Sequence, residues 1–203
     1  LAAATFSVFV ALGGAARADN LTPSQQLAHD IYRELVEIDT TTATGDTKKA
    51  AEALAARLKA AGFPDADVQA LSPAPRKGNL VARLRGTGKR KPILLVAHLD
   101  VVPALRADWS VDPFKLTEQD GYFWGRGSSD DKYMASSFVA NLIRYRQEGY
   151  KPDRDIILAL ETDEEIFDHE GLGIQWLLTD HRDLIDAEFA LNEGGPVNMK
   201  VGK

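Results

Sequence analysis

The sequence of 203 residues predicts an α/β fold with a mixed, largely parallel sheet between helices. Three observations carry this prediction. The apolar runs Ile93 to Ala97 and Ile156 to Leu160 are typical of strands buried on both faces. Segments with helical spacing of apolar residues alternate with the strands, as in βαβ units. The composition, 44% hydrophobic and 27% charged, is that of a globular domain with a sizeable core.

Two helices are expected near the N-terminus. The first begins with Thr22 as N-cap, Pro23 at the first helical position and Gln25 closing a capping box, and it ends at the threonine run 40–42. The second ends near Gly62, because glycine favours a helix C-terminus. Their apolar faces comprise Leu27, Ile31, Leu35 and Ile38 in the first helix and Ala51, Leu54, Ala55 and Leu58 in the second.

The remaining elements alternate between strand and helix. They are a strand at Asn79 to Leu84 with Leu80, Ala82 and Leu84 on one face, the two apolar strands, a helix at Asp131 to Gln147, a helix at Ile174 to Leu178 and a strand at Ala187 to Leu191. In sheets of this kind ligands bind beyond the carboxyl ends of the strands. The polar residues that follow the strands are therefore the first candidates for a site.

Charge and composition narrow the class of partner. The net charge of −6 and the pI of about 5.3 argue against nucleic acid or an anionic membrane surface and favour a small-molecule or peptide substrate. The chain has no cysteine, so any metal site must use histidine and carboxylates.

The N-terminal end has the pattern of an export signal. Leu1 to Leu12 is an apolar run, and Ala16-Arg17-Ala18 suits cleavage by a signal peptidase. We expect residues 1–18 to be a signal peptide that lacks its basic n-region, and the mature protein to be periplasmic or secreted with no stable membrane span. A lipid-facing anchor is the alternative.

Polar residues gather where three predicted strands end. His98 and Asp100 follow the strand at 93–97, Glu161 to Glu165 follow the next apolar strand, and Glu193 follows the last one. Side chains alternate along an extended segment, so His98 and Asp100 share a side with Leu99 opposite. Asp100 can then accept the second ring proton of a metal-binding His98.

Each feature also has a structural explanation. A buried histidine is often satisfied by the backbone, Asp131 can be an ordinary helix cap, and the acidic run at 163–165 can be a solvated loop. Together they favour a metal site, because consecutive carboxylates after a buried strand repel one another unless cations are present. One histidine with several carboxylates suits zinc, or cobalt or manganese, and a two-metal centre in which an unligated carboxylate takes a proton from water.

These motifs occur in an order that resembles one family. The succession is similar to that of the carboxypeptidase S, aminoacylase and succinyl-diaminopimelate desuccinylase family of di-zinc metallopeptidases, over roughly residues 24 to 196. The motifs are Ala97-His98-Leu99-Asp100-Val101-Val102-Pro103, Trp109, Asp112-Pro113-Phe114, Gly121, Gly125-Arg126-Gly127, Asp130-Asp131-Lys132, Asp163-Glu164-Glu165 and Glu193-Gly194-Gly195.

The resemblance implies a zinc-peptidase-like catalytic domain and roles for six residues. Two Zn²⁺ ions, or Co²⁺ or Mn²⁺ in their place, would be held by His98 and Glu193 at the first ion, Glu165 at the second and Asp130 between them. Glu164 would be the general base and Asp100 would orient His98. The peptide bond between Asp130 and Asp131 would be cis, with Asp131 structural rather than a ligand.

The chain also departs from the family pattern. Tyr133 stands where the family usually has glycine after Lys132. The family takes a last histidine ligand from its C-terminal part, after a lid or dimerisation domain, and none of His29, His169 and His181 suits that role. We therefore expect residues 19–203 to be the N-terminal part of the catalytic domain, inactive alone, with the lid that would form a homodimer absent.

Two functional hypotheses follow. The first is a peptidase or amidohydrolase of the carboxypeptidase, dipeptidase or aminoacylase type, which cleaves a small peptide or an N-acyl amino acid with a free carboxylate. The second is a catalytically silent exported domain that binds a metal or another ligand.

Overall fold

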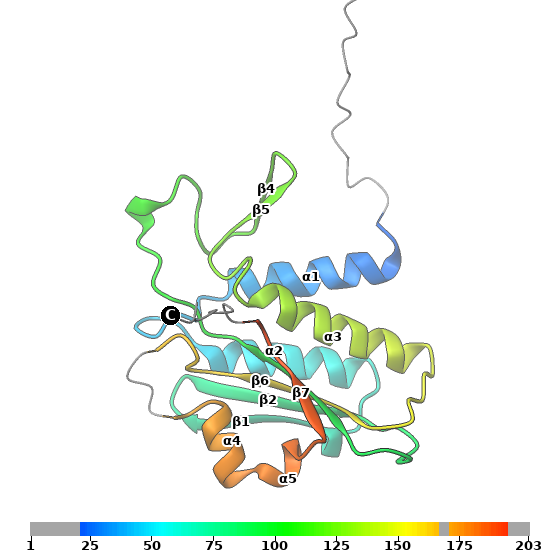
Figure 1. Cartoon of the computed structure of the whole chain (residues 1–203). Helices are drawn as coiled ribbons and strands as arrows, with labels where there is room; N and C mark the ends of the chain where they lie inside the picture. Colours follow the sequence, from blue (N-terminus) through cyan, green and yellow to red (C-terminus); the bar gives the residue numbers. More distant parts are fainter. Residues whose placement is uncertain (1–20, 167–170, 195–203) are drawn as a thin grey trace, which may run out of the picture.

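The structure is a computed structural model that describes residues 21–166 and 171–194 (Figure 1). The predicted signal peptide, its cleavage point after Ala18, and His169 lie outside these ranges. Within them, no helix is long and apolar enough to cross a membrane.

A five-stranded mixed sheet forms the centre of the fold. Its order is β1 (Val68–Ala74), β2 (Lys77–Leu84), β6 (Ile156–Glu161), β3 (Ile93–His98) and β7 (Phe189–Leu191). Strands β6, β3 and β7 are parallel, whereas β2 is antiparallel to both of its neighbours. The mixed sheet is as predicted. Strand β1 was not predicted, because Ser72 and Pro73 interrupt its pattern, and proline is tolerated at such an edge position.

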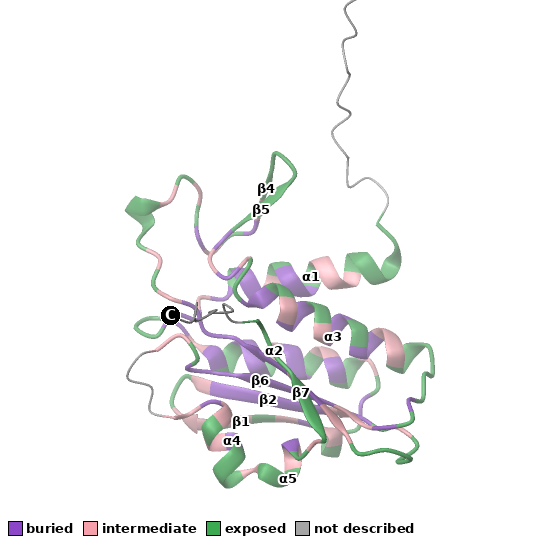
Figure 2. Cartoon of the chain, in the orientation of Figure 1, coloured by how far each residue is buried: buried purple, intermediate pink, exposed green. Residues whose placement is uncertain are grey.

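Helices cover both faces of the sheet (Figure 1). α2 (Thr47–Ala60) and α3 (Lys132–Gln147) pack on one face, and α1 (Pro23–Glu37) packs against α3. α4 (Ile174–Asp180) and α5 (Arg182–Ile185) pack on the other, where Leu177 and Ile185 contact apolar side chains of the sheet. The alternation of β2 is confirmed, since Leu80, Ala82 and Leu84 join the first core and Val81 joins the second. Figure 2 shows the buried residues concentrated in the inner strands and on the inward sides of the helices.

The predicted start of the first helix and end of the second are confirmed, whereas the first helix ends at Glu37, before the threonine run. The Thr22 hydroxyl accepts the N–H of Gln25 at 3.3 Å, and the Gln25 side chain accepts the N–H of Thr22 at 2.9 Å, which completes the capping box. Helix α2 stops at Ala60, just before Gly62, whose φ of +90° is a conformation that glycine adopts readily.

A small hairpin, β4 (Thr117–Gln119) and β5 (Tyr122–Trp124), lies over α1. It was not predicted, although its turn has a clear sequence cue. Asp120 and Gly121 have φ of +55° and +79°, as expected for an Asp-Gly turn between two strands. Phe123 packs edge-on against Tyr32 of α1 with ring centroids 5.4 Å apart, which ties the hairpin to the domain.

Candidate metal centre

The carboxyl ends of three parallel strands place the predicted site residues together. His98 is the last residue of β3 and pairs in register with Glu161, the last residue of β6. Glu164 and Glu165 follow β6, and Glu193 lies two residues beyond β7. The predicted convergence of strand ends is confirmed.

His98 is the centre of the cluster. Its Nε2 lies 2.8 Å from Oδ1 of Asp130. The same nitrogen lies 3.9 Å from Oε2 of Glu164 and 3.9 Å from Oε2 of Glu193. One potential metal-binding group comprises His98, Asp130 and Glu165, whose donor atoms lie within 4.8 Å of one another. A second group with the same spacing comprises His98, Asp131 and Glu193. All four residues predicted as ligands are therefore brought together, and their individual roles remain predictions.

Asp100 contacts His98 mainly through its backbone. Nδ1 of His98 lies 3.0 Å from the carbonyl oxygen of Asp100 and 3.7 Å from its carboxylate, while Leu99 points into the core on the opposite side. A proton on Nδ1 would be donated to that carbonyl, which leaves the Nε2 lone pair for a cation. The Asp100 carboxylate instead accepts the N–H groups of Glu164 at 3.2 Å and Glu165 at 3.0 Å. Asp100 therefore holds the histidine with its main chain and the acidic turn with its side chain.

The segment before α3 supplies the two adjacent aspartates. The peptide bond between Asp130 and Asp131 is cis, as expected. Asp131 is buried at the start of α3, makes no capping hydrogen bond, and its Oδ2 has no hydrogen-bond partner within the described residues. Asp131 also belongs to the group with His98 and Glu193, and its assignment as structural rather than a ligand stays a prediction.

Asp163 does not join the cluster. The sequence suggested that three consecutive carboxylates, 163–165, meet in the site. In the structure Asp163 has a φ of +68° and its buried carboxylate accepts a hydrogen bond from Nζ of Lys77. Of the three consecutive acids, Glu164 and Glu165 therefore lie at the site, and Asp163 forms an ion pair with Lys77 of β2.

Electrostatics of the cluster favour an added positive charge. Burial opposes protonation of His98, but its contacts with Asp100 and Asp130 outweigh burial and raise its pKa to about 10. Burial raises the pKa of Asp131 to about 6, against the attraction of His98. Burial and neighbouring carboxylates also raise the pKa of Glu165 and of Glu193. These carboxylates lie close enough together around one histidine for a bound cation to lower their mutual repulsion.

Two buried charged residues, to which no role was assigned from the sequence, lie beside the site. Nζ of Lys132 donates to the Ile38 carbonyl at 2.8 Å, and burial lowers its pKa to about 7 although Asp39 and Asp100 oppose the shift. Burial raises the pKa of Glu161 to about 7, and its carboxylate accepts the N–H of Ile174. The sequence showed Lys132 in a family motif and Glu161 at the end of an apolar strand, but it did not show that both side chains are buried.

The other described histidines are engaged elsewhere. His29 bonds to Glu118 of β4 at 2.7 Å, and His181 packs edge-on against Trp176 at the end of α4. Among the described residues neither belongs to a group around His98, and that neither replaces the family's last ligand stays a prediction.

Known proteins share this sequence and fold. An N-fatty-acyl-amino acid synthase/hydrolase of Xenopus tropicalis is 44% identical over 80 residues, which cover 39% of this chain and 16% of the relative. A succinyl-diaminopimelate desuccinylase of Delftia acidovorans is 40% identical over 116 residues, which cover 56% of this chain and 30% of the relative. The chain thus spans less than a third of the length of either relative.

A solved structure confirms the fold. The M20 family metallo-carboxypeptidase Sso-CP2 of Sulfolobus solfataricus superimposes with a TM-score of 0.68 at 18% identity, over 83% of this chain and 37% of that one. The family model for peptidase family M20/M25/M40 matches residues 94–203, which include His98, Asp130, Glu164, Glu165 and Glu193. On this match, and on a site built from the same motifs, the chain belongs to peptidase family M20/M25/M40.

Proposed function

We propose that this protein is a metal-dependent hydrolase that cleaves a peptide or N-acyl amide bond in a small substrate with a free carboxylate. The observation that carries the proposal is one histidine, His98, whose Nε2 faces the carboxylates of Asp130, Glu164 and Glu193 within 3.9 Å. The names of the relatives, a desuccinylase and an acyl-amino-acid hydrolase, support the same class of bond.

The donor set fits two zinc ions. Imidazole and carboxylate ligands without thiolate suit Zn²⁺, and also Co²⁺ or Mn²⁺, and leave positions open for substrate. His98 and Glu193 would hold one ion, Glu165 the other, and Asp130, whose Oδ1 lies 2.8 Å from Nε2 of His98, would bridge them. When bound, such ions polarise a carbonyl group and lower the pKa of a water molecule.

Glu164 is the residue best placed to move a proton. Its side chain is 42% exposed, and its Oε2 lies 3.9 Å from Nε2 of His98. Its backbone N–H is held by Asp100, which restricts where the carboxylate can reach. Glu164 would take a proton from water during attack on the amide carbon and pass it to the leaving nitrogen.

The proposal extends to the whole protein. Because the chain spans 16% and 30% of the two relatives, residues 19–203 would contribute the N-terminal part of a larger catalytic domain. A last histidine ligand and a dimer-forming lid would come from other parts of the protein. Residues 1–18 would direct export to the periplasm or the medium.

The test uses the full-length protein with zinc and a panel of dipeptides and N-acyl amino acids. Hydrolysis of at least one substrate is expected, and Glu164→Gln should reduce kcat about 100- to 10,000-fold while zinc binding in a calorimetric titration persists. Glu148→Gln, a matched change at an exposed position on the far end of α3, should leave kcat unchanged.

Two outcomes would contradict the proposal. Full activity of Glu164→Gln would show that another group is the base. Two tight zinc sites in the full-length protein, with no hydrolysis of any substrate, would instead favour the silent metal-binding domain.

A further inference from the structure

We propose that the ion pair between Lys77 and Asp163 is a positioning device that sets the geometry of Glu164 and Glu165. The inference rests on the proposed function, because it concerns the same metal centre. It assigns a role to two residues that belong to neither potential metal-binding group.

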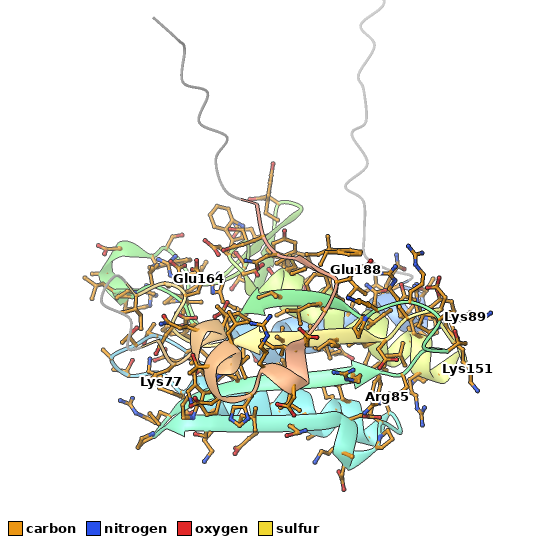
Figure 3. All side chains as sticks on the ribbon, turned by 60° about the horizontal axis from the view of Figure 1, so that its bottom comes forward. Lys77, Arg85, Lys89, Lys151, Glu164 and Glu188 are labelled. Carbon is orange, nitrogen blue, oxygen red and sulfur yellow. The ribbon has the colours of Figure 1, made fainter. Side chains whose placement is uncertain are left out.

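The pair is formed by the topology of the sheet. Strand β2 is antiparallel to β6, so its first residue, Lys77, lies beside the carboxyl end of β6. Nζ of Lys77 donates to Oδ1 of Asp163, with the two side chains 19% and 3% exposed. Figure 3 shows Lys77 and Glu164 at the same end of the molecule. At this burial, removing one partner leaves the other charge poorly solvated.

Asp163 also has a special backbone conformation. Its φ of +68° lies in the left-handed region, which is uncommon for residues other than glycine although aspartate tolerates it. The two residues that follow both direct their N–H groups to the Asp100 carboxylate. The turn at Asp163 therefore determines how the tandem glutamates present their side chains.

Hydrogen bonds from neighbouring elements also hold the residue before Asp163. The N–H of Thr162 donates to Oδ1 of Asn79 at 3.0 Å, and the Thr162 and Thr47 hydroxyls are 2.8 Å apart. These bonds anchor the residue before Asp163, and Asp100 anchors the two after it. Asp163 itself is held by the ion pair with Lys77 and by a longer hydrogen bond, 3.4 Å, from the Thr162 hydroxyl. Lys77 also neutralises a carboxylate that would otherwise add to the repulsion around Glu164 and Glu165.

The experiment compares four forms of the full-length protein: wild type, Lys77→Met, Lys77→Arg and the control Lys59→Met. Lys59 forms an ion pair with Asp65 on the surface, at 2.9 Å and with side chains 43% and 87% exposed. Two readouts are measured: Co²⁺ affinity from visible absorption with a competing chelator, and amide hydrogen exchange at Glu164 and Glu165 in metal-free protein.

Lys77→Met should weaken Co²⁺ binding about 10- to 100-fold, the range known for residues that orient metal ligands. It should also speed exchange at the two glutamates by about tenfold, because their turn opens more often. Lys77→Arg should restore most of both values, and Lys59→Met should change neither.

Unchanged Co²⁺ affinity and exchange in Lys77→Met would overturn the inference. Failure of Lys77→Arg to restore either value would also count against the inference, because an arginine side chain of similar length should form the same ion pair with Asp163. A wild-type protein that takes up no Co²⁺ would instead contradict the proposed function, and the exchange data would still decide whether Lys77 positions the turn.

Discussion

The two ends of the central sheet both carry acidic residues, but they differ in the cations that pair with them. At the end opposite the site, arginines neutralise the acids: Arg83 and Arg85 pair with Asp155 at 3.1 and 3.6 Å, and Arg154 pairs with Glu188 at 2.9 Å. At the site end, the described residues place no lysine or arginine in an ion pair with Asp130, Glu164 or Glu193, which share His98. Figure 3 shows Arg85 and Glu188 far from Lys77 and Glu164.

This difference identifies the site better than acidity does. Acidic side chains are common on protein surfaces, and most are solvated or paired with a cation. At the site end the carboxylates of Asp130, Glu164 and Glu193 instead share one buried histidine, and burial and neighbouring carboxylates raise the pKa of Glu193. Lys77 forms an ion pair with Asp163 at the same end of the sheet. Asp163 is therefore neutralised in the way that the acids at the opposite end are, and it does not belong to the cluster around His98.

The largest effect is expected from loss of a metal ligand. Glu165→Gln removes a carboxylate of the group with His98 and Asp130 and should lower zinc affinity by at least about 100-fold, since even residues that only orient ligands contribute about 10- to 100-fold. Calorimetric titration measures the affinity. Asp153→Asn, at the opposite end of the sheet, is the control and should keep the wild-type zinc affinity. Equal losses of zinc affinity in the two variants would mean that the two ends of the sheet do not differ in metal binding.

Metal binding should also stabilise the fold. Zinc at about 100 times its dissociation constant adds about 2.7 kcal/mol to the free energy of unfolding, which corresponds to a rise in Tm of about 5–10 °C for a domain of this size. Differential scanning calorimetry with zinc and with a chelator measures the shift. His98→Ala should remove most of it, and a rise that survives this change would place the bound metal elsewhere.

Glu161 should make stability fall as pH rises. Its pKa is about 7 in the folded protein and its ordinary value is 4.5, so the folded state binds more protons between these values. Stability is therefore lost between pH 4.5 and about 7, by on the order of 1–3 kcal/mol. Glu161→Gln, whose side-chain oxygen can still accept the Ile174 N–H, should be more stable than wild type at pH 8 and equal to it at pH 4.

Urea unfolding at the two pH values checks this expectation. Glu148→Gln, on the exposed end of α3, should show the wild-type difference between them. A Glu161→Gln variant that loses stability at both pH values would mean that the carboxyl group serves the fold in its ionised form.

The smallest effect belongs to the surface pairs at the opposite end. Arg90 and Asp153 are 3.5 Å apart with side chains 62% and 50% exposed. Arg90→Gln should change the free energy of unfolding by less than about 0.5 kcal/mol and leave zinc affinity unchanged. Urea unfolding and titration measure both, and a large change in zinc affinity would mean that charge at this end also matters to the site.

Much of the fold and the site could be predicted from local sequence. The capping box at Thr22, the buried strands before His98 and Glu161, and the helix after Asp131 follow from patterns within a few residues. The convergence of His98 and Glu164 follows as well, because parallel strands bring their carboxyl ends to one edge of a sheet. The Asp120-Gly121 hairpin was predictable in the same way and was missed.

Other features depended on the tertiary structure. The sequence by itself determined which residues can bind a metal and which strand ends present them, because residue type and the alternation of side chains along a strand are local properties. Only the folded structure decided that Lys77 meets Asp163, that Asp131 is buried beside His98, and that Asp100 holds the acidic turn. Those contacts depend on the antiparallel register of β2 against β6 and on packing between distant segments, which no short pattern in the sequence specifies.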